Sequence, residues 1–464
     1  MNSTVEIIFG LVGGLAVFLY GMNMMSECLQ KAAGEKMKSI LAMLTKNPVL
    51  GVLAGALTTA VLQSSSATTV MVIGFVSAGL MTLPQGISVI LGANIGTTMT
   101  AQLLAFKISD YILIIIFIGF ILSFVMKNEK IKSIGQTIFS FGLLFEGIEI
   151  MGSVMKPLAS SPVFISMIQH VSDVPVLGVA VGTLMTLVVQ SSSATIAVLQ
   201  NFASQAGPDG VTSIMGLAGA IPVLLGDNIG TTITALIACI GQSKDAKRTA
   251  LAHCTFNISG ALLFIWFTKP YAQFITMIST KGPEVEVIAR QIANAHTVFN
   301  ITMTLIWLPL IWLLVKIVTR IIPDGKTIIA ASGEPLFLDD KMIGQPAAAL
   351  EMAAREVLHC SDLVCELLDK VKTAVGEREN RNIEEINEDG NNIRKLYNRI
   401  MEYLANMFSA GVLTEEQASQ TAGLMYILSD VDRMGSSCAN IADAALSGVN
   451  FGYFIQEENE KDEE

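Results

Sequence analysis

LQSSSATT at residues 62–69 and VQSSSATI at residues 189–196 are two near-copies of one polar stretch in a largely apolar chain. Each places one glutamine and three serines between runs of apolar residues. Polar groups in an apolar surrounding are costly unless protein or water satisfies them. Small residues also let membrane helices pack closely, which could explain a single stretch. Close packing does not require a glutamine at the same position of both stretches, so the repetition favours a functional role.

The composition is that of an integral membrane protein. Of the 464 residues, 52% are hydrophobic and only 15% are charged, with a mean hydropathy of +0.57. That is too apolar for a water-soluble enzyme of this length. Residues 110–126 and 301–318 are continuous apolar runs, each about long enough to cross a hydrocarbon core as a helix. Six scattered cysteines without CxxC spacing favour neither a metal cluster nor a disulfide framework.

The two polar stretches belong to a longer internal repeat. Three pairs of segments recur in the same order: NPVLGV (47–52) with VPVLGV (174–179), QSSSAT at 63–68 and 190–195, and GANIGTT (92–98) with GDNIGTT (226–232). The two halves are therefore duplicates that differ by a small insertion near residues 204–210.

The distribution of positive charge predicts how the repeat is oriented. Lysine and arginine gather in four short segments, at 31–46, 127–132, 244–248 and 316–326. The positive-inside tendency places these segments in the cytoplasm. Seven crossings then leave the N-terminus outside and the C-terminus inside, with the two halves antiparallel. Inverted repeats of this kind are typical of secondary transporters.

Each polar stretch is expected at the tip of a re-entrant hairpin. Pro48 and Pro84 bracket two apolar arms, each too short to span a bilayer comfortably. The second hairpin should start from the opposite side of the membrane. The expected fold is all-α: a polytopic membrane protein with inverted repeats and two re-entrant hairpins, plus a cytoplasmic helical bundle.

The domain boundaries follow from changes in composition. The predicted parts are a transmembrane domain (1–322, with repeat one at about 5–126, repeat two at about 134–268 and an extra span at 293–318), a linker (323–345), a helical bundle (346–450) and an acidic tail (451–464). Within the bundle, helices are expected at about 346–376, 380–409 and 415–447.

The hairpin tips are candidate sites for an anion. A half-helix should start near Ser64 and another near Ser191, where hydroxyls can cap free N–H groups. Helix N-termini attract anions through those N–H groups and the aligned peptide dipoles. Hydroxyl donors at Ser64, Ser65, Ser191 and Ser192 suit a tetrahedral oxyanion.

The GANIGTT and GDNIGTT motifs are expected to interrupt helices and to bind a hard cation such as sodium. Their glycines would relax the backbone and free carbonyl oxygens. Asp227, which matches Ala93 in the first half, is a costly intramembrane carboxylate of the kind that serves ion pathways. The candidate cation ligands are Asn94, Thr97, Thr98, Asp227, Asn228, Thr231 and Thr232.

A third recurrence is AHCTFN (252–257) with AHTVFN (295–300), each following an arginine. His253 and His296 are expected to form hydrogen bonds between helices. Two rival functions remain open: a membrane enzyme with a serine nucleophile and one of these histidines as its base, and a sensor of the bound anion that signals through the tail. Two copies of each part and the lack of a Gly-x-Ser-x-Gly elbow argue against the enzyme.

The paired QSSSAT, G-(A/D)-N-I-G-T-T and AH-x-x-FN motifs resemble the bacterial sodium/phosphate cotransporter family, related to the animal type II sodium–phosphate cotransporters. The resemblance covers about residues 5–320. It implies sodium-coupled symport of inorganic phosphate in a dimer, at the cell's cytoplasmic membrane, with no enzymatic activity, further cofactor or nucleic-acid partner. Phosphate export, or transport of another oxyanion, is the alternative. By position, it implies a substrate region of Gln63, Ser64, Ser65, Ser66, Gln190, Ser191, Ser192 and Ser193.

The C-terminal bundle resembles the PhoU family through SDVDRMGSSCANIADAA (429–445). This implies a cytoplasmic regulatory domain linked with phosphate uptake, which could bind a regulatory protein. PhoU domains bind metals through acidic residues spaced four apart. Here Glu388 is followed by Asn392, and Asp432 by Ser436, so each pair lacks one carboxylate. Metal binding is therefore not expected.

Overall fold

The computed structural model describes residues 3–43, 47–77, 79–106, 108–159, 166, 168, 170–171, 173–207, 209–323, 333–344, 346–377, 383–411 and 413–446. These residues form helices and one isolated β-bridge, between Ala206 and Ser213, and contain no strand. The chain divides into two compact units, Met1–Asp324 and Gly325–Glu464. The prediction of an all-helical fold is confirmed for the residues that the structure describes.

The first unit carries the duplicated motifs. Its helices are α1 (Ser3–Met43), α2 (Pro48–Leu62), α3 (Ser65–Ser77), α4 (Leu83–Leu104), η1 (Ser109–Tyr111), α5 (Ile112–Phe124), α6 (Glu129–Ala159), α8 (Pro175–Val189), α9 (Ser192–Ala203), α10 (Gly216–Ala238), α11 (Lys244–Phe264), η2 (Ile265–Phe267), α12 (Thr268–Ile278), α13 (Glu284–Trp307) and α14 (Ile311–Ile321).

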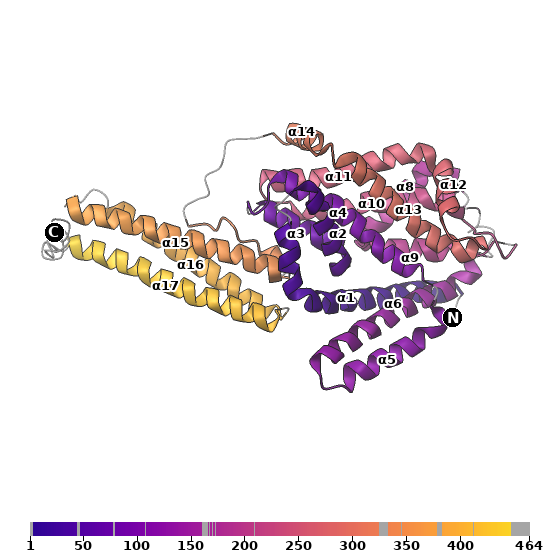
Figure 1. Cartoon of the computed structure of the whole chain (residues 1–464), viewed down its shortest axis with the longest axis horizontal. Helices are drawn as coiled ribbons and strands as arrows, with labels where there is room; N and C mark the ends of the chain where they lie inside the picture. Colours follow the sequence, from indigo (N-terminus) through magenta and orange to yellow (C-terminus); the bar gives the residue numbers. More distant parts are fainter. Residues whose placement is uncertain are drawn as a thin grey trace. The chain divides into compact units, whose positions relative to one another are not determined.

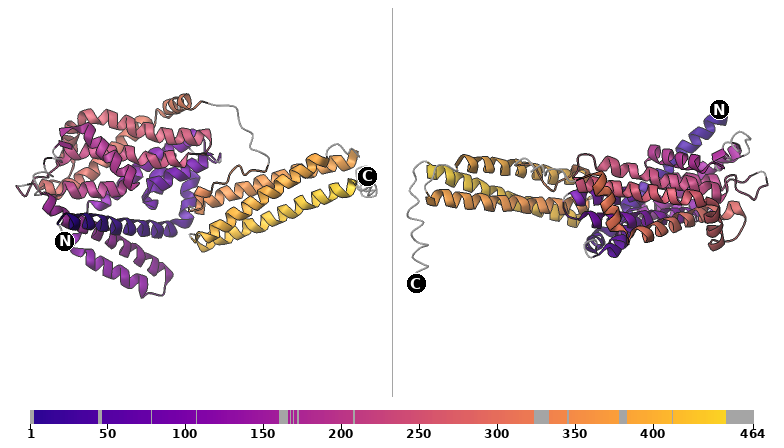
Figure 2. Two further views of the ribbon diagram at one scale, coloured as in Figure 1. Left: turned by 180° about the vertical axis from the view of Figure 1, so that it is seen from behind. Right: turned by 90° about the horizontal axis from the view of Figure 1, so that it is seen from above.

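Helices α1 and α6, which begin the two halves, lie side by side and run in opposite directions (Figures 1 and 2). A Cβ atom added to Gly14 would lie 2.9 Å from the carbonyl oxygen of Gly147. One added to Gly21 would lie 2.7 Å from the backbone nitrogen of Leu144. Glycine is therefore required for the two backbones to approach this closely.

Glycines also bring α2 against α4. A Cβ atom at Gly55 would lie 2.0 Å from the Val89 carbonyl oxygen, and one at Gly92 would lie 1.9 Å from that of Val52. The second half repeats this contact between α8 and α10. There, a Cβ atom at Gly182 would lie 2.0 Å from the carbonyl oxygen of Val223.

The prediction that GANIGTT and GDNIGTT interrupt their helices is wrong. Helix α4 continues through the first motif and α10 through the second. The motif glycines keep their helical conformation and serve as contact points for α2 and α8. A glycine lowers helix propensity, but it also lets a neighbouring backbone approach closely. Here the close packing outweighs the lower propensity, and the helices continue.

Among the described residues, five helices are long and apolar enough to cross a membrane, or six when the bent pair α13 and α14 counts as one span. Of the seven predicted crossings, the one at 110–126 is a shorter apolar helix, Ser109–Phe124. The lysine-rich segment expected as a loop at 31–46 is helical as far as Met43, because α1 continues through it. The run 301–318, expected to cross as one helix, is instead divided between α13 and α14, which meet at an angle of 83°.

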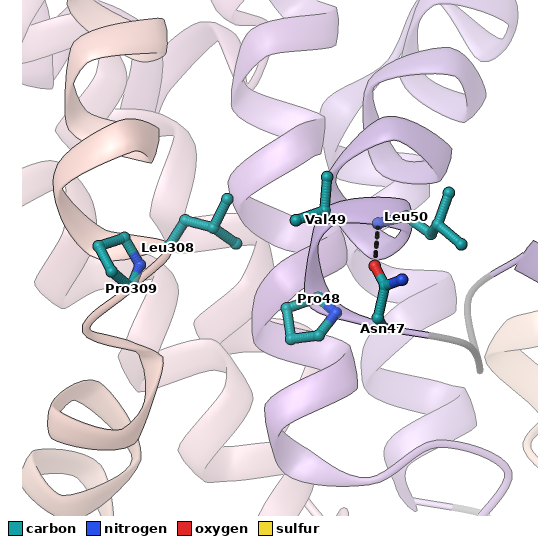
Figure 3. A pocket seen from close by; sticks show the side chains of 6 residues that line it. All are labelled: Asn47, Pro48, Val49, Leu50, Leu308 and Pro309. Atoms are coloured by element: carbon teal, nitrogen blue, oxygen red, sulfur yellow. Dashed lines mark hydrogen bonds between the residues drawn. The ribbon is translucent and has the colours of Figure 1, made fainter.

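Pro309 lies at the sharp bend between α13 and α14, where the two axes differ by 83°. Proline lacks the N–H that would continue the hydrogen-bond ladder. Figure 3 shows the groove beside this bend, with a volume of about 550 Å³. Its other wall is the start of α2, where the Asn47 side chain accepts a hydrogen bond of 2.9 Å from the Leu50 nitrogen. The groove is apolar and lies apart from the duplicated polar motifs.

The second unit contains η3 (Asp340–Met342) and the long helices α15 (Pro346–Glu377), α16 (Ile383–Ser409) and α17 (Glu415–Leu446). The three long helices run alongside one another (Figure 1). Lys370 of α15 joins α16 through hydrogen bonds of 2.7 Å to Asp389 and 2.6 Å to Glu385. These bonds raise the pKa of Lys370, so the ammonium group stays charged at neutral pH.

The segment before α15 is fastened to the bundle by a buried carboxylate. Glu356 is fully buried, and its Oε2 accepts a hydrogen bond of 2.6 Å from the Phe337 nitrogen. Its Oε1 lies 2.8 Å from Nδ1 of His359. Tyr403 also donates a hydrogen bond of 3.1 Å to the Asp339 carbonyl oxygen. Among the described residues no cluster of three or more metal-ligating side chains is present.

We predict that Gly182→Ala destabilises the first unit. Its new Cβ would lie 2.0 Å from the Val223 carbonyl oxygen, and overpacking of this kind costs about 1–3 kcal/mol. Thermal unfolding of the detergent-purified protein measures the effect. The control is Gly13→Ala, whose Cβ meets nothing within 4 Å, and it should unfold at or slightly above the wild-type temperature. Equal unfolding temperatures for the two variants would contradict the packing described above.

Candidate functional site

Both QSSS motifs lie where one helix ends and the next begins. Gln63 follows α2 and Gln190 follows α8, and each adopts a left-handed conformation with φ of 53°. In the part of the chain that the structure describes, they are the only non-glycine residues with positive φ. A side chain in this region costs about 1–2 kcal/mol. The same strained conformation at two matched positions points to a functional requirement.

A serine caps the helix that follows each glutamine. Ser64 Oγ accepts a hydrogen bond of 3.1 Å from the Ala67 nitrogen, at the start of α3. Ser191 Oγ accepts one of 3.3 Å from the Ala194 nitrogen, at the start of α9. The first turn of each helix has further N–H groups without intrahelical partners. The caps thus lie where the sequence predicted half-helices to start.

Threonine pairs hold the two arms of each turn together. Thr59 donates a hydrogen bond of 2.9 Å to Thr68, and Thr186 one of 3.0 Å to Thr195. Only the second pair has a carboxylate beside it, because Oδ1 of Asp227 lies 2.7 Å from Thr186 Oγ1. Asp227 is fully buried, and its Oδ2 has no partner among the described residues.

Each helix that follows a QSSS turn packs against the polar helix of the other half. Helix α3 lies against α10, and α9 lies against α4. Thr234 of α10 donates a hydrogen bond of 3.2 Å to Ser66 at the start of α3. Gln200 of α9 donates one of 3.1 Å to the Ala101 carbonyl oxygen of α4. These contacts between the two halves bring both turns and both polar helices into one core.

The two glutamines differ in their surroundings. Gln63 is buried, and its Oε1 accepts a hydrogen bond of 3.0 Å from Thr100 of α4. Its Nε2 donates one of 2.5 Å to the Ala60 carbonyl oxygen. Gln190 is exposed. Thr100 and its counterpart Thr234 were not predicted as site residues, although a threonine follows both GTT triplets two residues later.

The candidate cation ligands are buried on α4 and α10 in matching arrangements. In each half, the asparagine amide group and the threonine hydroxyls donate to carbonyl oxygens of their own helix, over three or four residues. The bonds are Asn94 to Ile90 (2.8 Å), Thr97 to Ala93 (3.1 Å), Thr98 to Ile95 (2.8 Å), Asn228 to Leu224 (3.0 Å), Thr231 to Asp227 (2.9 Å) and Thr232 to Ile229 (2.7 Å). The threonine oxygens keep lone pairs that can accept further bonds, whereas the asparagine oxygens already have partners on neighbouring helices.

The AH-x-x-FN motifs hold these asparagines from neighbouring helices. His253 Nε2 lies 3.3 Å from Asn94 Oδ1, and His296 Nε2 lies 3.1 Å from Asn228 Oδ1. Since the asparagine NH₂ groups donate to their own helices, their oxygens accept and each Nε2 carries the proton. The expected hydrogen bonds between helices are therefore present. Neither imidazole contacts a QSSS serine in the described part of the chain, as the rival serine enzyme would require.

The duplicated part of the chain matches a family of phosphate transporters. Residues 17–153 and 154–282, together more than half of the chain, match the family model described as Na⁺/Pi-cotransporter. The chain belongs to this Na⁺/Pi-cotransporter family. Residues 357–445 match the PhoU domain model. Family membership and the apolar helices make the protein a multi-pass membrane protein of a transporter family.

Curated relatives cover both parts of this cotransporter-family chain. "Uncharacterized protein YqeW" of Bacillus subtilis is 33% identical over 66% of this chain and 95% of its own length. "Putative inorganic phosphate export protein YjbB" of Escherichia coli K12 is 25% identical over 94% of this chain and 78% of its own length. Human "Sodium-dependent phosphate transport protein 2B" is 35% identical over 20% of this chain and 14% of its own length. No solved structure gives a significant match.

We predict that His296 and Asn228 stabilise the cotransporter-family unit as a pair. Removing one partner of a buried hydrogen bond leaves the other unsatisfied, at a cost of about 1–3 kcal/mol. His296→Ala and Asn228→Ala should therefore each lower the thermal unfolding temperature. The decrease in the double variant should be smaller than the sum of the two single decreases. His170→Ala, at an exposed histidine, is the control. Strictly additive losses would show that the two side chains do not interact.

Proposed function

We propose that this protein carries inorganic phosphate across the cytoplasmic membrane together with sodium, by alternating access. The proposal depends above all on the reciprocal packing of α3 on α10 and of α9 on α4. That packing puts two capped helix starts and two polar helices in one core. The description of the family supports phosphate as the cargo and sodium as the coupling ion.

Phosphate would bind at the starts of α3 and α9. Each serine cap uses one N–H group of its first turn and leaves others free for an anion. The hydroxyls of the two motifs add neutral donors, so the cargo can be held without a permanent salt bridge. The proposed substrate region is Gln63, Ser64, Ser65, Ser66, Gln190, Ser191, Ser192 and Ser193.

Sodium would bind beside Asp227. A fully buried carboxylate with an unpartnered oxygen is costly unless a cation or a proton neutralises it. Carboxylate, amide and hydroxyl oxygens suit a hard cation. The proposed ligands come from Asn94, Thr97, Thr98, Asp227, Asn228, Thr231 and Thr232. Because Ala93 replaces the carboxylate in the first half, the stronger cation site should lie in the second half.

Two halves of opposite orientation are a common basis of alternating access. The antiparallel contact of α1 with α6 supports that arrangement, because these helices begin the two repeats. We infer two re-entrant hairpins, at α2–α3 and α8–α9, entering from opposite sides. We also propose a homodimer with the PhoU domain in the cytoplasm, where it would regulate transport, alone or through a protein partner.

Phosphate export is the second candidate. The relative from Escherichia coli, whose printed name describes phosphate export, aligns with 94% of this chain. The same binding core would serve export if the cell's phosphate gradient, rather than sodium, set the direction. Transport assays with imposed gradients in either direction separate the two functions.

Uptake of labelled phosphate into proteoliposomes tests the proposal. An inward sodium gradient should accelerate uptake over an equal choline gradient, and unlabelled phosphate should compete better than sulfate. Ser65→Ala combined with Ser192→Ala should reduce uptake at unchanged thermal stability, because two hydroxyl donors are lost. Equal uptake in sodium and choline would remove sodium coupling and favour the export function. Wild-type vesicles without any phosphate flux would overturn both.

Asp227→Ala, which copies Ala93 of the first half, should weaken sodium activation. Loss of a charged ligand costs about 1.5–3 kcal/mol, so the sodium concentration for half-maximal uptake should rise by roughly tenfold or more. Asp110→Asn removes an exposed carboxylate and is the control. An Asp227→Ala variant with wild-type sodium activation would exclude this carboxylate as a sodium ligand.

A further inference from the structure

Arg290, on α13, is a partly buried guanidinium without an acidic partner. Its Nη1 donates hydrogen bonds of 2.9 Å to the Gln102 carbonyl oxygen and 2.6 Å to Gln102 Oε1. Its Cζ lies 4.6 Å from the centre of the Phe106 ring. No carboxylate of the described residues forms an ion pair with it. Its charge is therefore offset only by neutral groups.

The sister arginine is neutralised. Arg248 precedes the first AH-x-x-FN motif, as Arg290 precedes the second. Arg248 Nη1 lies 2.6 Å from Asp245 Oδ1, and its Nε donates a hydrogen bond of 2.9 Å to the Ile322 carbonyl oxygen. An arginine thus precedes each motif by four or five residues, and of the two only Arg290 has no acidic partner among the described residues.

The free edge of Arg290 suits an oxyanion. A guanidinium carries five N–H donors, and both hydrogen bonds to Gln102 use Nη1. In the described part of the chain, Nε and Nη2 donate to no residue. These two groups form the flat edge that binds carboxylate or phosphate oxygens in pairs. Gln102 is itself fixed by bonds of 3.0 Å to Asn294 and 3.1 Å to Thr297, so the arginine is held in place.

Arg290 is bonded to the segment of α4 that also contacts both QSSS-bearing segments. Within one turn of α4, Thr100 bonds Gln63, the Ala101 carbonyl oxygen accepts from Gln200 of α9, and Gln102 holds Arg290. A group bound to Arg290 is therefore connected to both QSSS-bearing segments through consecutive residues of one helix. A permanent cation placed beside a neutral binding region would attract an anion without holding it at the centre.

We propose that Arg290 is the cationic element of a second phosphate-binding subsite, beside the QSSS turns. Inorganic phosphate would accept hydrogen bonds from the Nε and Nη2 edge as it moves to or from the turns. The inference rests on the proposed function for its transport role, but it predicts binding whether or not the protein transports. Loss of this subsite should weaken phosphate binding and leave sodium binding unchanged.

Isothermal titration of inorganic phosphate into the detergent-purified full chain, in sodium, tests the subsite. Arg290→Gln should raise the phosphate Kd roughly tenfold, the range expected for loss of a charge-assisted bidentate contact. The ratio of the variant's Kd to that of the wild type should be smaller at high salt, because salt screens the charge of Arg290. Lys269→Gln removes one exposed positive charge from α12 and should bind phosphate like the wild type.

Sodium binding measured without phosphate separates a binding role from a structural one. If Arg290 only joins α4 to α13, Arg290→Gln will weaken sodium binding in the absence of phosphate as well as phosphate affinity, and that result overturns the subsite. An unchanged phosphate Kd overturns it as well. Should Arg290→Gln fail to fold, Arg290→Lys keeps the charge but loses the planar edge, and an unchanged Kd in that variant is equally decisive. Wild-type protein that binds phosphate in an Arg290-dependent way but moves none would overturn the proposed function alone.

Discussion

A helix that ends among apolar neighbours must find partners for its free N–H and C=O groups, and this requirement organises the first unit. The chain meets it twice with the same residues. A glutamine in the left-handed conformation ends one helix, and a serine side chain caps the next. These two turns carry the polar groups, and the rest of the unit holds them against two polar helices.

Close contact between backbones makes that support possible. Small residues allow α2 to touch α4 and α8 to touch α10, so the turns stay near the helices that bear asparagine and threonine. The contacts of α3 with α10 and of α9 with α4 then link the two copies. A change in one half would be felt in the other, which is what a transporter with a single central site needs.

The two halves share a frame but differ in charge. Asp227 stands where the first half has Ala93, and Gln63 is buried where Gln190 is exposed. A symmetric frame can adopt two mirror-related states of similar energy. Under the proposed function, differences of this kind would bias it toward one state and place the cation and the anion differently.

The sequence by itself determined the membrane class, the duplication, the helix ends at the two turns and the choice of motif residues, because composition, repetition and capping are local properties. It misjudged the GANIGTT and GDNIGTT glycines, since a glycine that breaks a helix and one that admits a neighbour look alike in sequence. Only the tertiary structure decided which histidine holds which asparagine and which arginine stays unpaired. Those contacts join residues such as Gln102 and Asn294, 192 positions apart, and depend on how the helices pack.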